Sequence, residues 1–154
     1  MMPLNTARAH FSLWCVTSSP LYLGMKLENL SASDPSLAIV SNRDAIMVNQ
    51  AWAGFAGDML NASQYGPLNI TKSNYSRLPA NSVWWKPLPN ASAAVVMYAS
   101  RGAASMSVGL DELSWDGKPA LPPAASNCKA KSIWDGGTED TDPCEVHQLE
   151  LEDL

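Results

Sequence analysis

Charge and long apolar runs are scarce in this chain of 154 residues. Charged residues make up 16% of the sequence, and the formal net charge is −5. No basic cluster is present to favour nucleic acid as a partner. The longest uninterrupted apolar run is Ala93 to Ala99, far shorter than the roughly 18 residues of a membrane span. The sequence therefore predicts neither a nucleic-acid-binding protein nor a membrane protein.

Residues that usually carry catalysis or hold metal ions are also few. His10 and His147 are the only histidines, and together with Cys128 and Cys144 they fit no C-x-x-C or H-x-x-x-H spacing. The nucleophile elbow, the Walker loop and the dinucleotide fingerprint are absent. The acidic run at 138–142 lacks the glycine and the spaced glutamate of an EF-hand, which favours a solvated loop over a calcium site. We therefore predict no catalytic residue, no metal ligand and no cofactor in this chain.

The N-terminus lacks the basic start, apolar middle and small-residue cleavage site of a signal peptide. Sequons for N-glycosylation are nevertheless abundant, since five occur where chance predicts roughly one or two. The asparagines that we predict as glycosylation sites are Asn29, Asn61, Asn69, Asn74 and Asn90. The sequons indicate the secretory pathway, so we expect a longer protein that carries its own signal.

The three cysteines cannot all pair. Cys128 and Cys144 lie in the same loop-rich tail, where a disulfide would close a short loop and stabilise the fold by roughly 3 kcal/mol. We predict this pair, with three reduced thiols as the alternative. Cys15 follows Leu13 and Trp14 in an apolar run and is predicted to be a buried free thiol.

The first fifty residues predict an α/β unit. Asn5 is expected to cap a helix that ends by about Thr17. The segment Pro20–Gly24 is then apolar on both faces, which is typical of a buried parallel strand. Asp34, followed by proline, is expected to cap a second helix, and Asn42 a third. The predicted order is helix, strand, helix, helix.

Beyond Gly57 the pattern changes to short β-like runs at 82–88, 93–99, 106–110 and 146–151. The stretch VWWKPLPNASAAVVMYA is a hairpin candidate, and several short strands separated by turns predict an antiparallel sandwich. Trp84 and Trp85 are adjacent, so in a strand one faces inward and one outward. The outward ring either packs on a neighbouring domain, which we favour, or touches sugar.

Three segments carry a resemblance to a known family. They are RAHFSLWCVTSSPLYLG, IVSNRDAIMVNQAWAG and VWWKPLPNASAAVVMY. Their order and spacing, from about residue 7 to about residue 100, resemble the C-terminal part of glycoside hydrolase family 27. This family comprises the α-galactosidases and α-N-acetylgalactosaminidases.

The resemblance implies a fold of two parts. Residues 1–54 would be the C-terminal remnant of a (β/α)8 catalytic barrel, namely its last helix-strand-helix segment. Residues 55–154 would be an antiparallel β-sandwich. The implied class is therefore α/β plus all-β, in agreement with the change of pattern near residue 55. A lone barrel remnant cannot complete a sheet, so we expect exposed apolar surface on residues 1–50 unless they pack on the sandwich.

The resemblance also implies an activity for the parent protein. The family is a retaining one, with a carboxylate nucleophile and a carboxylic acid/base. Both belong to barrel strands that precede the H-F-S-L-W helix, so no catalytic or substrate-binding residue is carried over. Where the family often has an acidic residue after the P-L-x-x-G motif, this chain has Met25 and Lys26.

We therefore expect a C-terminal fragment of a retaining α-galactosidase-like hydrolase that removes terminal α-linked galactose. The fragment itself is expected to be inactive and to need no cofactor. The expected partner is the α-galactoside substrate of the parent, and the expected location is secreted or lysosomal/vacuolar. The alternative is a non-catalytic β-sandwich module that binds carbohydrate or protein.

Overall fold

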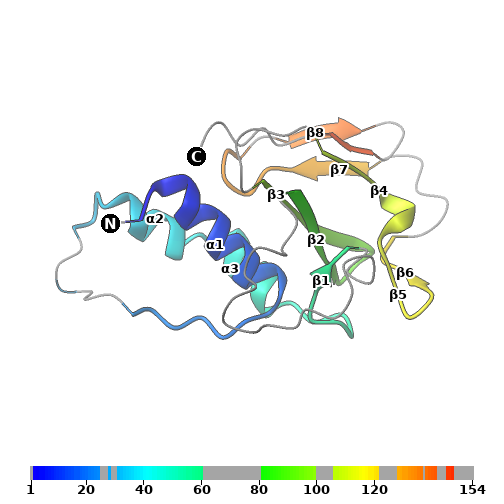
Figure 1. Ribbon diagram of the computed structural model, residues 1–154, viewed down its shortest axis with the longest axis horizontal. Coiled ribbons are helices and arrows are strands. Elements are labelled where there is room, and N and C mark those ends of the chain that lie inside the picture. The colour runs from blue at the N-terminus through cyan, green and yellow to red at the C-terminus, as the bar shows by residue number, and fades with distance from the viewer. Residues whose placement is uncertain are drawn as a thin grey trace, which may run out of the picture.

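The computed structural model describes residues 2–24, 28, 31–60, 81–99, 106–121, 128–136, 138–141 and 145–147. Three helices gather at one end of the molecule and the strands at the other (Figure 1). The long β2–β3 hairpin lies between the helices and the remaining strands. The helices end at Gln50 and the first strand begins at Asp58.

The helices are α1 (Leu4–Val16), α2 (Pro35–Val40) and α3 (Arg43–Gln50). Two predicted caps are confirmed. The Asp34 carboxylate accepts from the backbone N–H of Ser36 at 2.8 Å, and the Asn42 side chain accepts from that of Ala45 at 3.0 Å. Each cap satisfies a backbone donor that has no partner within the helix.

The predicted cap at Asn5 is wrong. Helix α1 begins at Leu4, and Pro3, two residues before Asn5, occupies the cap position with no side-chain hydrogen bond. The carbonyl of Pro3 accepts from the N–H of Ala7 at 2.9 Å. The restricted φ of proline suits the start of a helix, so Asn5 falls inside the first turn.

The strand predicted at Pro20–Gly24 is also absent. Residues 19–24 run as irregular backbone along α2 and α3. A strand exists only beside a neighbour that shares its ladder of hydrogen bonds. No described strand pairs with this segment. Its apolar residues suit a strand that is buried between neighbouring strands. The described chain does not supply such neighbours.

The central sheet has the order β1-β2-β3 and is antiparallel. Its strands are β1 (Asp58–Met59), β2 (Asn81–Leu88) and β3 (Ser92–Ala99). The predicted hairpin is confirmed, with Trp85 opposite Val95. At its turn Asn90 and Ala91 have φ of 62° and 52°, and the Ser92 hydroxyl donates to the carbonyl of Pro89 at 2.7 Å.

The other described strands form three antiparallel pairs. These are β4 (Ser107–Gly109) with β9 (Glu145–His147), β5 (Ser114–Trp115) with β6 (Lys118–Pro119), and β7 (Cys128–Lys131) with β8 (Thr138–Thr141). A short 3-10 helix, η4 (Leu110–Glu112), follows β4. The described chain after residue 57 is thus β-rich and antiparallel.

The solvated loop predicted at 138–142 is wrong, because its first four residues form strand β8. The run begins with four residues that pair with β7, and Lys129 stands opposite Asp140 in the register. The partner strand lies earlier in the chain, so the acidic run alone did not indicate it.

Two apolar clusters hold the fold together. The first joins the helices to the sheet, through Phe11 and Cys15 of α1, Val48 of α3 and Ala94 of β3. The second lies within the strands and is built on Trp85, which is 3% exposed. Trp85 is therefore the inward member of the tryptophan pair. Trp84 is half-buried, and its indole N–H donates to the Ser82 hydroxyl at 3.0 Å.

Candidate functional site

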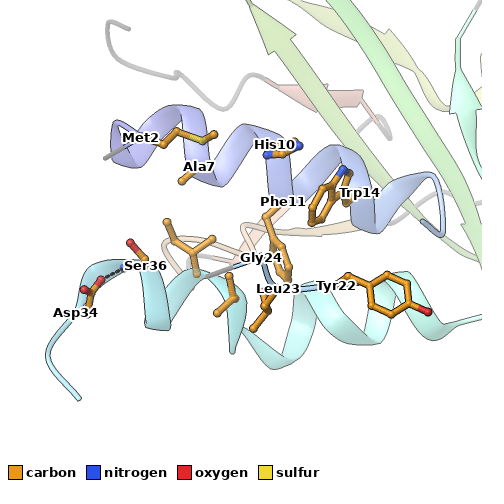
Figure 2. A pocket seen from close by; sticks show the side chains of 12 residues that line it. Met2, Ala7, His10, Phe11, Trp14, Tyr22, Leu23, Gly24, Asp34 and Ser36 are labelled. Atoms are coloured by element: carbon orange, nitrogen blue, oxygen red, sulfur yellow. Dashed lines mark hydrogen bonds between the residues drawn. The ribbon is translucent and has the colours of Figure 1, made fainter. Parts of the chain in front are cut away.

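An apolar groove of about 330 Å³ lies between α1 and α2. Figure 2 shows α1 above it and α2 below, with the segment 22–24 crossing between them. Helix α1 contributes His10, Phe11 and Trp14, and α2 contributes Ile39 and Val40. The three walls thus come from the three parts that were predicted as helix, strand and helix.

Of the three walls, the segment 22–24 is the most exposed. Tyr22 is 81% exposed and Leu23 is 43% exposed, and both line the groove. Met2, at the far end, is also largely exposed. Large apolar side chains gathered on one face of a soluble protein mark a surface that binds another apolar surface.

The polar groups of the groove do not form a hydrolytic set. Asp34 is the one carboxylate among its described lining residues, and that carboxylate already accepts from the N–H of Ser36. The ring of His10 lies against that of Trp14, with centroids 4.4 Å apart. Retaining glycoside hydrolysis needs two carboxyl groups about 5 Å apart. The groove therefore suits packing and not bond cleavage.

A second feature is the junction where the helices meet the sheet. Lys86 of β2 is fully buried, and its Nζ donates to the carbonyls of Val48 at 2.6 Å and Asn49 at 3.0 Å. Burial lowers the pKa of Lys86, an effect that Cys15 partly offsets. Burial raises the pKa of the Cys15 thiol to about 11, with Lys86 acting in the opposite direction. Two of the segments that carry the family resemblance therefore meet at one buried ammonium.

The junction continues to the end of α1. The Asn49 side chain donates to the carbonyls of Trp14 at 3.3 Å and Ser19 at 2.8 Å. The Ser18 hydroxyl donates to the carbonyl of Ala56 at 2.8 Å. At Gly57, with φ of 94°, an added Cβ would lie 1.9 Å from the carbonyl oxygen of Val16. Only glycine fits at so close an approach of two backbones.

A second cavity, of about 290 Å³, lies between α1, α3 and β3. Polar contacts close its rim. The Trp134 indole N–H donates to the Ser12 hydroxyl at 3.1 Å, and Lys131 pairs with Asp44 at 2.6 Å. The Arg8 guanidinium lies 5.8 Å from the centre of the Trp134 ring. This cavity belongs to the helix–sheet interface.

The structure places some of the residues predicted from sequence. Asn90 is exposed at the β2–β3 turn, where a glycan would have room, and its glycosylation stays a prediction. Cys15 is a buried free thiol, as predicted. His10 lies in α1, and the backbone of His147 ends β9. Within the described ranges, no three His, Cys, Asp or Glu side chains gather as metal ligands would.

Other predicted residues lie outside the described residues. They are Met25, Lys26, Asn29, Asn61, Asn69, Asn74 and Cys144. Cys128 is in β7 and is not free, and its pairing with Cys144 stays a prediction. No helix in the described ranges has the length and apolar character to cross a membrane.

Neither the groove nor the burial of Lys86 is among the features predicted from the sequence. The groove has no local signal, because it forms only when α1, α2 and the segment between them come together. Lys86 does have a signal, since it is the one charged residue in the apolar run that forms β2. A lysine in such a run is expected to bond backbone carbonyls or a carboxylate when the strand is buried.

Comparison with curated proteins and solved structures identifies relatives, although no family model matches the chain. An α-galactosidase of Zygotorulaspora mrakii is 27% identical over 136 residues, which are 87% of this chain and 27% of that protein. A probable α-galactosidase D of Aspergillus niger is 30% identical over 138 residues, which are 88% of this chain and 18% of that protein. The chain thus spans about a quarter or less of the length of these two relatives.

The fold has a solved counterpart in α-galactosidase I from Mortierella vinacea. The match has a TM-score of 0.68 at 19% identity and covers 95% of this chain and 34% of that structure. The relatives and the solved structure match most of this chain and only a minor part of each longer protein. These likenesses support the resemblance of this chain to the C-terminal portion of glycoside hydrolase family 27, the α-galactosidases.

Proposed function

We propose that this chain is the C-terminal portion of a retaining α-galactosidase that removes terminal α-linked galactose. In this proposal residues 1–54 are the last helix-strand-helix segment of a (β/α)8 barrel, and residues 55–154 are its antiparallel β-sandwich. The α-galactosidases that match most of the chain support the activity. The order of three helices followed by antiparallel strands supports the division.

The observation that carries the proposal is the uncovered apolar groove. In a (β/α)8 barrel the helices cover an inner ring of parallel strands with their apolar sides. The exposed side chains of Tyr22 and Leu23, together with the half-buried Trp14 of α1, would meet that ring, since all three line the groove. The segment Pro20–Gly24, apolar on both faces, would become a strand once neighbouring strands supply its ladder.

The chain by itself is then inactive. Among the described residues that line its groove, Asp34 is the one with a carboxylate, whereas the reaction requires a nucleophile and an acid/base. In our proposal both aspartates, and the residues that bind galactose, come from the part of the parent that precedes this portion. The parent needs no cofactor and is secreted or lysosomal/vacuolar, as the five sequons suggest.

A chimera tests the proposal. This chain replaces the matching 34% of α-galactosidase I from M. vinacea, and the substrate is 4-nitrophenyl α-galactoside. We expect turnover by the chimera and none by the purified chain of 154 residues. Leu23→Asp should reduce turnover by the chimera at least tenfold, because it places a charge on the surface proposed to meet the barrel strands.

The matched control is Ser114→Asp, which adds the same charge at an exposed position of β5. This variant should retain the turnover of the chimera. Turnover by the isolated chain would refute the claim that the fragment is inactive. A folded chimera without activity would refute the assignment to the α-galactosidase barrel.

The alternative, a module that binds carbohydrate or protein, has one supporting observation. Trp52, which follows α3, is 66% exposed, and exposed indole rings stack on sugars or anchor protein interfaces. The test is titration of the isolated chain with galactose oligosaccharides, followed by tryptophan fluorescence. A saturable change that Trp52→Ala abolishes would favour the binding module.

A further inference from the structure

The ammonium of Lys86 is enclosed at the junction between helices and sheet. Its acceptors are the carbonyls of Val48 and Asn49, in the last turn of α3. Carbonyls at the C-terminal end of a helix lack intrahelical partners and carry the negative end of the helix dipole. A buried cation is well compensated there. Lys86 thus attaches the sheet to the C-terminal end of α3.

Asn49 connects the end of α3 to the end of α1. Its side-chain amide donates to the carbonyls of Trp14 and Ser19. The N–H of Ser19 also donates to the carbonyl of Trp14, at 2.9 Å. These bonds hold the end of α1 against the end of α3. The chain then continues directly into Pro20, and two residues later it reaches the wall of the groove.

We propose that Lys86 and Asn49 are positioning residues that fix the groove wall at residues 19–24 to the β-sheet. The contacts run from Lys86 to the backbone of Asn49, from the Asn49 side chain to Ser19, and from Ser19 along the chain to Tyr22. The inference deepens the function proposed above and rests on it only for the role of the groove. The sheet sets the position of the segment that, in our proposal, becomes a barrel strand.

A positioning role and a general contribution to stability predict different effects on the segment 19–24 and on the sheet. A general contribution to stability, lost when a buried hydrogen-bond donor is removed, would affect the whole fold. A positioning role predicts something different, namely a segment that loosens while the sheet stays intact. Ser19 reports on the segment through its hydrogen-bonded amide, and the amides of β2 and β3 report on the sheet.

The test is amide hydrogen exchange, followed by NMR on the full chain, for Lys86→Met and Asn49→Ala. In both variants we expect the amide of Ser19 to exchange at least tenfold faster, with the β2 and β3 amides unchanged. The double variant should loosen Ser19 no further than either single variant, because the two side chains act in series. The matched control is Lys118→Met, at an exposed lysine of β6, which should leave Ser19 unchanged.

Unchanged exchange at Ser19 in both single variants would overturn the proposal. A uniform rise over Ser19 and the sheet amides would also overturn it, since that result indicates global destabilisation only. If Lys86→Met does not fold, Asn49→Ala decides, because it leaves both carbonyl acceptors of Lys86 in place. These measurements use the isolated chain and no substrate, so their outcome is independent of the activity of the chimera.

Discussion

The helical segment and the strands differ in how completely their apolar side chains are covered. The large apolar side chains that are exposed in the described residues are Met2, Leu4, Tyr22, Leu23, Met47 and Trp52. All of them precede β1. The strands instead enclose Trp85, Val108 and Leu113 in a cluster of their own.

This difference shows which apolar side chains are covered within the described chain and which remain exposed. Trp85 of β2 and Trp115 of β5 both lie against the Phe55 ring, with ring centroids 5.6 Å and 5.3 Å apart. The helices pack on the sheet through Cys15 and Val48, whereas the groove between α1 and α2 has exposed apolar side chains at Met2, Tyr22 and Leu23. Three experiments test this contrast, and they follow in order of decreasing expected effect.

The largest effect is expected from truncation of Trp85. We expect Trp85→Ala to lower the free energy of unfolding by about 4 kcal/mol, because it removes a buried ring and leaves a cavity. Tyr22→Ala, in the groove, should change the free energy by less than about 0.5 kcal/mol, since its ring is largely exposed. Urea unfolding followed by circular dichroism measures both. Equal losses would contradict the contrast between a covered sheet and an uncovered groove.

A somewhat smaller effect is expected at the close approach of Gly57 to α1. Gly57→Ala should cost about 3 kcal/mol, because its Cβ would overlap the Val16 carbonyl and its φ is positive. Gly117→Ala is the matched control, with φ of 70° and open space around the added Cβ. It should cost about 1 kcal/mol, the strain of a positive φ alone. Thermal unfolding of both variants tests the difference, and similar midpoints would show that the helices do not approach the sheet so closely.

The smallest of the three effects depends on pH. Burial raises the pKa of Cys15 from 9.0 to about 11, so the unfolded thiol ionises before the folded one. The resulting stabilisation is complete below pH 9 and is lost as the pH rises from 9 to 11, by about 2 kcal/mol. The lowered pKa of Lys86 acts in the opposite direction, since it favours folding as the pH rises toward 10.5.

The comparison of the chain with Cys15→Ala isolates the thiol. The variant should lose less stability than the unaltered chain between pH 9 and pH 11, as measured by urea unfolding at each pH. Parallel losses would mean that the thiol is not buried at the helix–sheet interface.

Local signals in the sequence predicted the elements that local chemistry determines. The caps at Asp34 and Asn42 and the β2–β3 hairpin were predicted because each depends on a few neighbouring residues. The strand at Pro20–Gly24 was wrong because a strand depends on neighbours that the described chain does not contain. Strand β8 was not predicted because the acidic run by itself does not indicate its partner, β7, which precedes it across the connection 132–137.

The candidate site was less predictable than the fold. The groove arises from the packing of α1 on α2, and the Lys86 contacts join β2 to the end of α3. Both depend on distant parts of the chain. The resemblance to family 27 identified the relevant segments, and the structure shows that two of them meet at Lys86.

The central claim is that the groove is the surface by which this chain joins the catalytic barrel of an α-galactosidase. The most direct test is the turnover of 4-nitrophenyl α-galactoside by the chimera, compared with its Leu23→Asp and Ser114→Asp variants. We expect turnover by the chimera, a loss of at least tenfold with Leu23→Asp and no loss with Ser114→Asp. Equal turnover by all three proteins would contradict the claim.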